Sequence, residues 1–197
     1  MKCRAILILL IASLYLLSGT PEAQAAESPA EANPVSADRT AFDEAFADYK
    51  AMIRQIEDLR IEYQTADQAR REEINLQFPS LIAEGQKKVD KMIAEALKLY
   101  QASPEADAKV SELLYTVAQH KLVGSGANSQ GGDQFEQAFD IIQALIEGGN
   151  ESAGLATMGV ISAFCTNHYD VAEEYAAIAT ERKEKASFLG ADLLDKA

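Results

Sequence analysis

The sequence has little of what a catalytic or metal centre needs. It contains two histidines, His120 and His168, and these fall in different predicted helix pairs. We therefore do not expect them to converge on one metal ion. No arrangement of a nucleophile with a histidine and an acid is recognisable either. The sequence thus predicts no catalytic residue, no metal site and no cofactor. A small exported enzyme would need a convergent polar pocket, which no motif indicates.

Cysteine is almost absent as well. Cys3 lies in a predicted leader, which leaves Cys165 alone in the mature chain, so no intramolecular disulfide is expected. Cys165 follows apolar residues such as Ile161 and Phe164 and is predicted to be a small core residue. The alternative is a reactive thiol, which needs a neighbouring base, and His168 is the candidate.

Basic residues are scarce relative to acidic ones. The chain has 18 Lys and Arg against 31 Asp and Glu, a net charge of -13. Loss of Lys2, Arg4 and Glu22 with the leader makes the mature chain more acidic by one charge. Nucleic acids and anionic membrane surfaces repel such a chain. We expect neither as a partner.

The N-terminus has the form of a signal peptide over residues 1–25. Lys2 and Arg4 precede an apolar run, and Ala23-Gln24-Ala25 predicts cleavage before Ala26. The run is shorter than the roughly 20 residues that span a bilayer. A retained anchor is the alternative reading. We expect an exported protein, periplasmic or extracellular, with no stable membrane insertion after cleavage.

Residues 26–39 are rich in Ala, Pro, Ser and Glu and predict a disordered linker before a helical domain at 40–197. Thr40 is the expected N-cap of a long first helix. A heptad seam with one polar position is predicted at alternating steps of four and three residues: Phe42, Phe46, Tyr49, Ile53, Ile56, Arg60 and Tyr63. A break near residues 65–68 would fold a second helix back as a hairpin, and Pro79 is expected to kink or restart that helix.

Shorter helices follow the hairpin. Ser103-Pro104 predicts a helix start, and the Gly-rich segment 124–132 predicts a flexible loop, since it lacks the order of a phosphate-binding loop. Gly148-Gly149 should end one helix and Asn150 should cap the next. Asn167 suits a left-handed turn residue, and residues 181–185 are expected to continue the last helix in solvent. A weaker helical tail is expected at 186–197. No alternation typical of strands occurs, so the predicted class is all-α.

Two stretches of the sequence repeat at a spacing of about 34 residues, the period of the tetratricopeptide helix pair. We call this spacing the repeat period. An aromatic residue, a small residue and two apolar residues of the first stretch recur in the second: Phe135, Ala138, Ile142 and Leu145, then Tyr169, Ala172, Ala176 and Ala179. The segment from Ser162 to Tyr175 resembles the turn and second helix of that repeat. The resemblance implies a small residue at Ala172 that lets two helices approach closely.

Residues 40–185 also resemble the N-terminal helical region of exported bacterial proteins that end in a cyclophilin-type peptidyl-prolyl isomerase. The similarity is carried by Phe42-Asp43-Glu44-Ala45, the stretch from Ile61 to Ala66, the stretch from Leu81 to Gly85, and Ala163-Phe164-Cys165-Thr166-Asn167. No segment of the isomerase domain itself is recognisable. No active-site residue is therefore carried over to this chain.

The sequence favours an all-α fold in which an antiparallel helix hairpin precedes tetratricopeptide-like helix pairs. We interpret it as an exported, non-catalytic protein-interaction module for an unidentified protein or peptide. The predicted contact residues are polar and lie on the first helix of each pair: Tyr115, Gln119, Thr157 and Ser162. The alternative function is the accessory N-terminal region of a truncated or diverged prolyl isomerase or folding factor.

Overall fold

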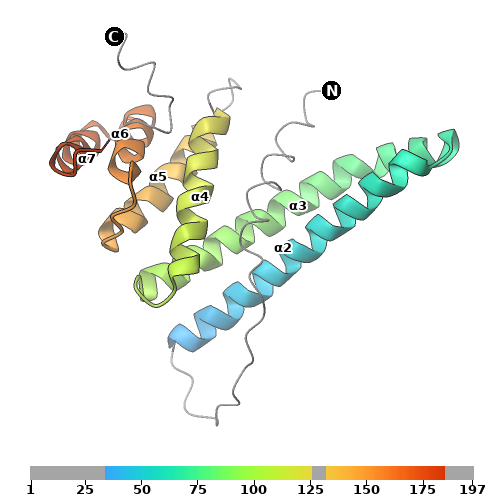
Figure 1. The fold of residues 1–197 in the computed structure, drawn as a ribbon, viewed down its shortest axis with the longest axis horizontal. Coiled ribbons are helices and arrows are strands. Elements are labelled where there is room, and N and C mark those ends of the chain that lie inside the picture. Colours follow the sequence, from blue (N-terminus) through green and yellow to red (C-terminus); the bar gives the residue numbers. More distant parts are fainter. Residues whose placement is uncertain (1–33, 126–131, 185–197) are drawn as a thin grey trace. The chain divides into compact units, whose positions relative to one another are not determined.

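The computed structural model describes residues 34–125 and 132–184, and these are helical throughout except for short turns (Figure 1). No strand occurs in these two ranges, which confirms the all-α class. The described residues form two compact units, 34–102 and 103–184, where the sequence predicted a single helical domain. We call them the hairpin unit and the four-helix unit.

The hairpin unit consists of two long antiparallel helices, α2 (Pro34–Thr65) and α3 (Gln68–Ala102). The expected break is confirmed at Ala66 and Asp67. The Asp67 carboxylate accepts the backbone N–H of Arg70 at 2.9 Å, which makes it the N-cap of α3. Across the tip, the Arg70 guanidinium binds both carboxylate oxygens of Glu62, at 2.7 and 3.2 Å, and this hydrogen bond lowers the pKa of Glu62.

The buried seam of α2 differs from the predicted one at every second position. The residues that face α3 are spaced by three and then four: Phe42, Ala45, Tyr49, Met52 and Ile56 are buried, and Leu59 and Tyr63 continue the line half-buried. Phe46 and Ile53 are only half-buried, and Arg60 is exposed. The predicted seam followed the larger apolar side chains. In the actual seam, the small side chain of Ala45 is buried in place of the neighbouring Phe46.

The start of α2 was predicted wrongly, and one of the two outcomes expected at Pro79 is excluded. Helix α2 begins at Pro34 and not after Thr40, so residues 34–39 belong to the helix and not to a linker. Proline suits the first helical turn, where its missing N–H costs no hydrogen bond. Of the two outcomes expected at Pro79, a kink or a restart, the restart does not occur, because Pro79 lies inside one 35-residue helix, α3. Pro79 is exposed, so water can solvate the carbonyl that loses its backbone donor.

The four-helix unit contains α4 (Ala108–Ser125), α5 (Gly132–Glu147), α6 (Leu155–Cys165) and α7 (Tyr169–Glu181). Each helix packs on the next, and α4 also contacts α6. This order describes two helix pairs, α4 with α5 and α6 with α7. The core is formed by apolar residues from all four helices, of which the largest fully buried ones are Val110, Leu114, Ile141, Ile142, Leu145, Leu155 and Met158.

Two helix starts in this unit were misplaced from the sequence. Ser103 and Pro104 lie in a turn, and α4 begins at Ala108, where the Asp107 carboxylate accepts the Lys109 N–H at 2.8 Å. Asn150 does not cap α6, which begins only after Gly154 in a left-handed conformation (φ 82). In both cases the residue predicted to cap the helix is followed by a turn, and the helix begins only at Ala108 or Leu155.

Three helices of this unit end in the same way. A left-handed residue follows the helix: Gly149 after α5 (φ 79), Asn167 after α6 (φ 64) and Lys183 after α7 (φ 52). In each case the next N–H reaches back five residues to a carbonyl, as Asn150 does to Leu145 at 2.9 Å. The predictions for Gly149 and Asn167 are confirmed. The expected helical continuation at 181–185 is wrong, because α7 ends at Glu181.

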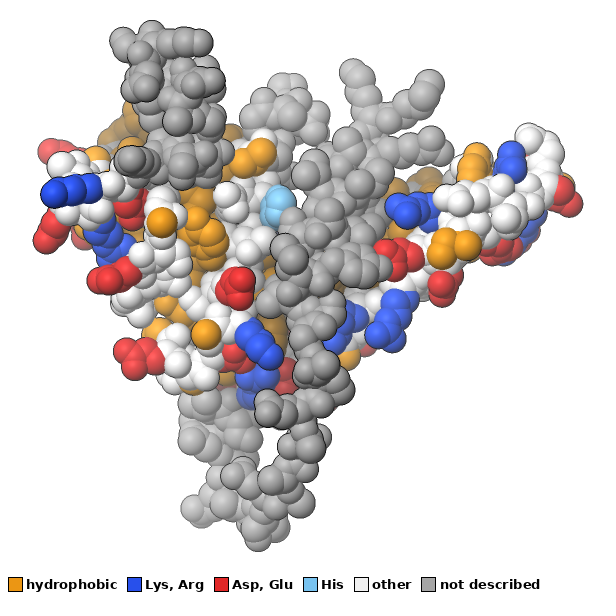
Figure 2. Space-filling model, in the orientation of Figure 1, with side chains coloured by type: hydrophobic (Ala, Val, Ile, Leu, Met, Phe, Trp, Pro, Cys, Tyr) orange, Lys and Arg blue, Asp and Glu red, His pale blue; other side chains and the backbone are white. Residues whose placement is uncertain are grey.

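The predicted signal peptide, most of the predicted linker, most of the Gly-rich loop and the predicted tail at 186–197 lie outside the described residues. Within the described residues, no helix is both long and apolar enough to cross a membrane. Figure 2 shows Lys, Arg, Asp and Glu side chains interspersed along the exposed face of the α2/α3 hairpin.

Candidate interaction surface

Three of the four predicted contact residues lie at least partly at the surface of the four-helix unit. Tyr115 and Gln119 are half-buried on α4, one turn apart, and Thr157 is half-buried in the first turn of α6. The Tyr115 hydroxyl donates to the Ala153 carbonyl at 2.8 Å, which holds the start of α6 against α4. Burial raises the pKa of Tyr115, and the nearby Glu184 carboxylate adds to this. The structure therefore brings Tyr115 and Thr157 close to one carboxylate.

Ser162 cannot contact a partner, and its prediction was wrong. Its side chain is fully buried, and its hydroxyl donates to the Gly159 carbonyl at 3.1 Å within α6. A serine that satisfies its own hydroxyl within the helix can occupy a core position. The prediction placed Ser162 at the surface because serine is polar, but its position on α6 faces the core.

Sequence reasoning missed Glu184, the residue that the structure places at the centre of this region. Its carboxylate accepts the N–H and the hydroxyl of Thr157 at 2.9 and 3.0 Å, and the N–H of Ala156 at 3.4 Å. These N–H groups belong to the first turn of α6, where a negative charge is favourable. Glu184 therefore links the end of α7 to the start of α6.

A related contact closes the preceding helix pair. The Asn150 amide, which follows α5, donates to the Ser111 hydroxyl near the start of α4 at 2.6 Å. Asn150 and Glu184 are one repeat period apart and hold the same place after their helices. We call this link from the end of the second helix to the start of the first the closing contact. The repeat period, followed beyond Leu145 and Ala179, could have revealed it.

The turn between α6 and α7 presents an exposed aromatic pair. Phe164 is 64% exposed and Tyr169 is 56% exposed, and their rings meet edge to face with centroids 5.5 Å apart. The Tyr169 hydroxyl donates to the Asn167 side chain at 2.8 Å. Cys165 is also exposed, which contradicts its predicted core role. Its neighbour Ala163 takes the buried position instead.

The predicted repeat face is correct at some positions only. Ala138 and Ala172 are both buried, whereas Tyr169 and Ala176 are exposed. One turn after Ala138 and Ala172, the chain places Ile141 and Tyr175. Both are buried, and they are also one repeat period apart. The buried face of α7 is therefore rotated by one residue from the predicted one.

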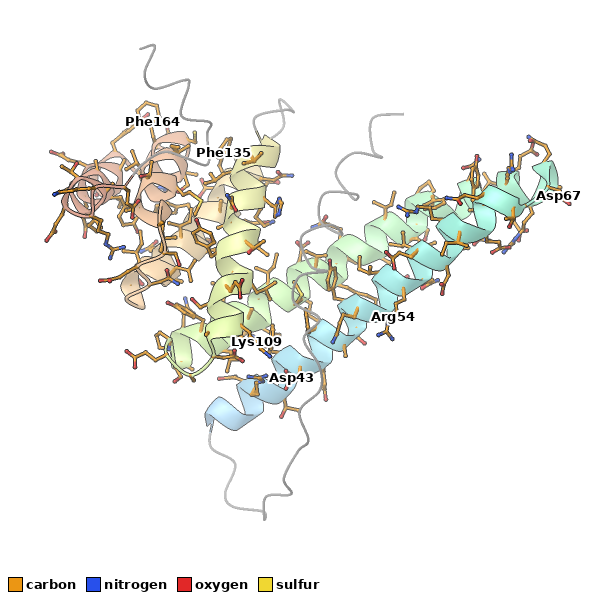
Figure 3. All side chains as sticks on the ribbon, viewed as in Figure 1. Asp43, Arg54, Asp67, Lys109, Phe135 and Phe164 are labelled. Atoms are coloured by element: carbon orange, nitrogen blue, oxygen red, sulfur yellow. The ribbon has the colours of Figure 1, made fainter. Side chains whose placement is uncertain are left out.

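The first half of α5 lies against the α6–α7 turn. The Phe139 ring stacks on the His168 ring with centroids 4.5 Å apart and planes within 4°. Within the turn, the Thr166 hydroxyl lies at hydrogen-bond distance from His168 Nδ1, at 2.9 Å. Figure 3 shows Phe135 and Phe164 toward the same end of the four-helix unit. His168 thus has a packing role that joins α5 to this turn.

Negative charge dominates the exposed surface of α5 and α7. Between Lys121 and Arg182 the chain has no Lys or Arg, although it has nine Asp and Glu. Those on α5 and α7 are exposed: Asp133, Glu136, Asp140, Glu147, Asp170, Glu173, Glu174 and Glu181. The described residues contain no cluster of three or more His, Cys, Asp or Glu that could hold a metal ion. The acidic side chains of α5 and α7 therefore form an exposed, negatively charged surface.

Comparisons with protein-family models, curated proteins and solved structures find no match to this chain.

Proposed function

We propose that this chain is an exported, non-catalytic protein-interaction module whose C-terminal part consists of tetratricopeptide-like helix pairs. The observation that carries the proposal is the repeated closing contact. Asn150 returns to the start of α4 and Glu184 returns to the start of α6, with one repeat period between them. A repeat of this length, in which a helix pair closes on itself and stacks on the next, is typical of scaffolds that present binding surfaces.

The helix contacts support the same proposal. In stacked helix pairs the first helix of one pair touches the first helix of the next, and α4 contacts α6 in this way. Tyr115, Gln119 and Thr157 lie on those first helices and are half-buried. Part of each polar side chain stays accessible, although the hydroxyls of Tyr115 and Thr157 also hold the start of α6 in place.

Site-specific photo-crosslinking tests the proposal. A benzophenone amino acid at Gln119 in the exported protein should give discrete crosslinked products in the producing cells. The same residue at Gln55, an exposed glutamine on α2, is the matched control and should give none of these products. Identical products from both positions would contradict a specific interaction surface on the first helices. The same conclusion would follow if neither Gln119 nor a second test position, Tyr115, gave any product.

The resemblance to the helical region of cyclophilin-type isomerases leads to a second measurement. An interaction module that works without its own chemistry should not accelerate prolyl isomerisation in a peptide assay. Turnover by the purified chain would replace the proposed function with an enzymatic one.

A further inference from the structure

We infer that the exposed aromatic pair Phe164 and Tyr169 is a docking surface for a cationic protein segment that carries Arg or Lys next to an apolar side chain. The inference deepens the proposed function and rests on it, because it names a second surface and the chemistry of its partner. The surface consists of Phe164, Cys165 and Tyr169 at the α6–α7 turn, together with the flanking carboxylates Asp170 and Glu173 of α7.

Exposure of these two rings has no explanation in the packing of the four-helix unit. Both side chains are more than half exposed, while the neighbouring aromatic residues Phe139 and Tyr175 are buried in the core at 5% and 4%. The edge-to-face contact with Tyr169 and the hydrogen bond from Tyr169 to Asn167 fix the pair in place. A rigid exposed aromatic surface loses little side-chain entropy on binding.

Two accessible aromatic rings of the hairpin unit, Phe46 and Tyr63, each lie under a cation of the same unit. The Lys50 ammonium lies 4.6 Å from the centroid of Phe46, and the Arg71 guanidinium lies 5.7 Å from the centroid of Tyr63. A cation over a ring face is attracted by its negative quadrupole. In the hairpin unit, therefore, the chain supplies a cation for each of these two rings.

The aromatic pair has no such internal cation near it in sequence. Residues 122–181, which contain both rings, include no Lys or Arg. Arg182 follows the opposite end of α7 from Tyr169, and its guanidinium donates to the Asn150 carbonyl at 3.2 Å. A partner can therefore supply the cation that the chain itself supplies elsewhere.

Charge complementarity selects the occupant. Asp170 follows Tyr169 directly, and Glu173 lies one turn further along α7. The stacking of Phe139 on His168 brings the first half of α5, with its exposed Glu136 and Asp140, to the same end of the unit. These carboxylates would repel an acidic partner, a second copy of this acidic chain included, and attract a basic one.

Fluorescence anisotropy with a defined peptide tests the inference. The probe is a fluorescein-labelled peptide of Gly-Arg-Leu-Arg repeats, and the control probe has Glu in place of each Arg. We expect saturable binding of the first peptide only, and weaker binding as salt is added, because exposed charges are screened. Phe164→Ala and Tyr169→Ala should each weaken binding by about tenfold, as expected for aromatic side chains that become buried when the peptide binds.

Two further variants separate the surface from general effects. Leu76→Ala removes a side chain that is 82% exposed in the hairpin unit, so it should leave the affinity unchanged. Glu173→Gln should weaken binding and reduce its salt dependence. Circular dichroism checks that each variant is folded. We expect all four to fold, because the substituted side chains are exposed.

Several outcomes would overturn the inference. These are no saturable binding of the Arg peptide, equal binding of the Glu peptide, or an equal loss in Leu76→Ala and Phe164→Ala. A Phe164-dependent dimer in sedimentation without peptide binding would assign the surface to a second copy. Crosslinks from Gln119 that persist in the Phe164→Ala variant would still support the proposed function, so the two failures are distinguishable.

Discussion

At the residue scale, two buried glycines inside helices differ in how much room their surroundings leave for a side chain. A Cβ on Gly159 of α6 would lie 2.5 Å from the Tyr175 ring of α7, closer than any real contact. A Cβ on Gly85 of α3 would meet Met52 at 3.6 Å, an ordinary van der Waals distance. Gly159 is thus required by the packing of α6 on α7, whereas Gly85 is replaceable.

Alanine at the two positions should change stability in opposite directions. Gly159→Ala should lower the free energy of unfolding by about 1–3 kcal/mol, because the Tyr175 ring must move. Gly85→Ala should raise it by about 0.5–1 kcal/mol, because alanine loses less backbone entropy in a helix. Urea unfolding followed by circular dichroism measures both. A destabilised Gly85→Ala variant would mean that α2 and α3 approach more closely than described.

At the element scale, the register of α7 is fixed by Ala172 and Tyr175. Both are buried in a small cluster with Phe139 and Ala163, while Ala177 is exposed. Ala172→Leu should therefore cost about 1–3 kcal/mol through overpacking. Ala177→Leu should change stability by only a few tenths of a kcal/mol, since alanine and leucine have similar helix propensities. Thermal melts of the two variants compare them, and an equal loss would contradict this register.

The closing contact gives a second prediction for these elements. Glu184→Ala removes the carboxylate that accepts the first-turn N–H groups of α6, and the loss should be about 1 kcal/mol, as for other helix caps. Glu181→Ala is the matched control, because Glu181 is exposed at the last position of α7. It should be neutral or slightly stabilising, since a negative charge at a helix C-terminus is unfavourable. A larger loss in Glu181→Ala in urea unfolding would argue against the closing contact.

The same elements show what could be predicted from the sequence. Helix type, the break before Gln68 and the left-handed residues Gly149 and Asn167 follow from local rules of periodicity and backbone conformation. Which of two adjacent residues is buried does not, because Ala45 and Phe46 differ by only one position and the neighbouring helix decides between them.

The candidate site was harder to predict for the same reason. Tyr115, Gln119 and Thr157 lie at least partly at the surface, as expected. Ser162 was predicted at the surface and is buried, and Cys165 was predicted in the core and is exposed, so the predicted register of α6 was wrong. Glu184 was missed because its role depends on a turn that folds the chain back on α6. Such a contact between residues distant in sequence has no local signal apart from the repeat period.

At the scale of the whole molecule, a buried tyrosine in each unit has a raised pKa. Burial raises the pKa of Tyr49 in the hairpin unit to about 12. Burial, with the nearby Glu147 and Glu174, raises the pKa of Tyr175 in the four-helix unit to about 12. In the unfolded chain both phenols ionise near pH 10. The folded state of each unit therefore favours the neutral phenol.

This difference predicts that both units lose stability over the same alkaline range. Stability from the neutral phenols is complete below about pH 10 and is lost as the pH rises through about 12, since only the unfolded chain releases the protons easily.

Tyr49→Phe should reduce the alkaline loss of the hairpin unit without removing a hydrogen bond, because the buried Tyr49 hydroxyl has no partner among the described residues. Tyr175→Phe should do the same for the four-helix unit, whereas the exposed Tyr169→Phe is the control. Urea midpoints measured at several pH values between about 9 and 12 test the window. If both core variants kept the full alkaline sensitivity of the parent chain, ionisation of these two tyrosines could not be what limits its stability at high pH.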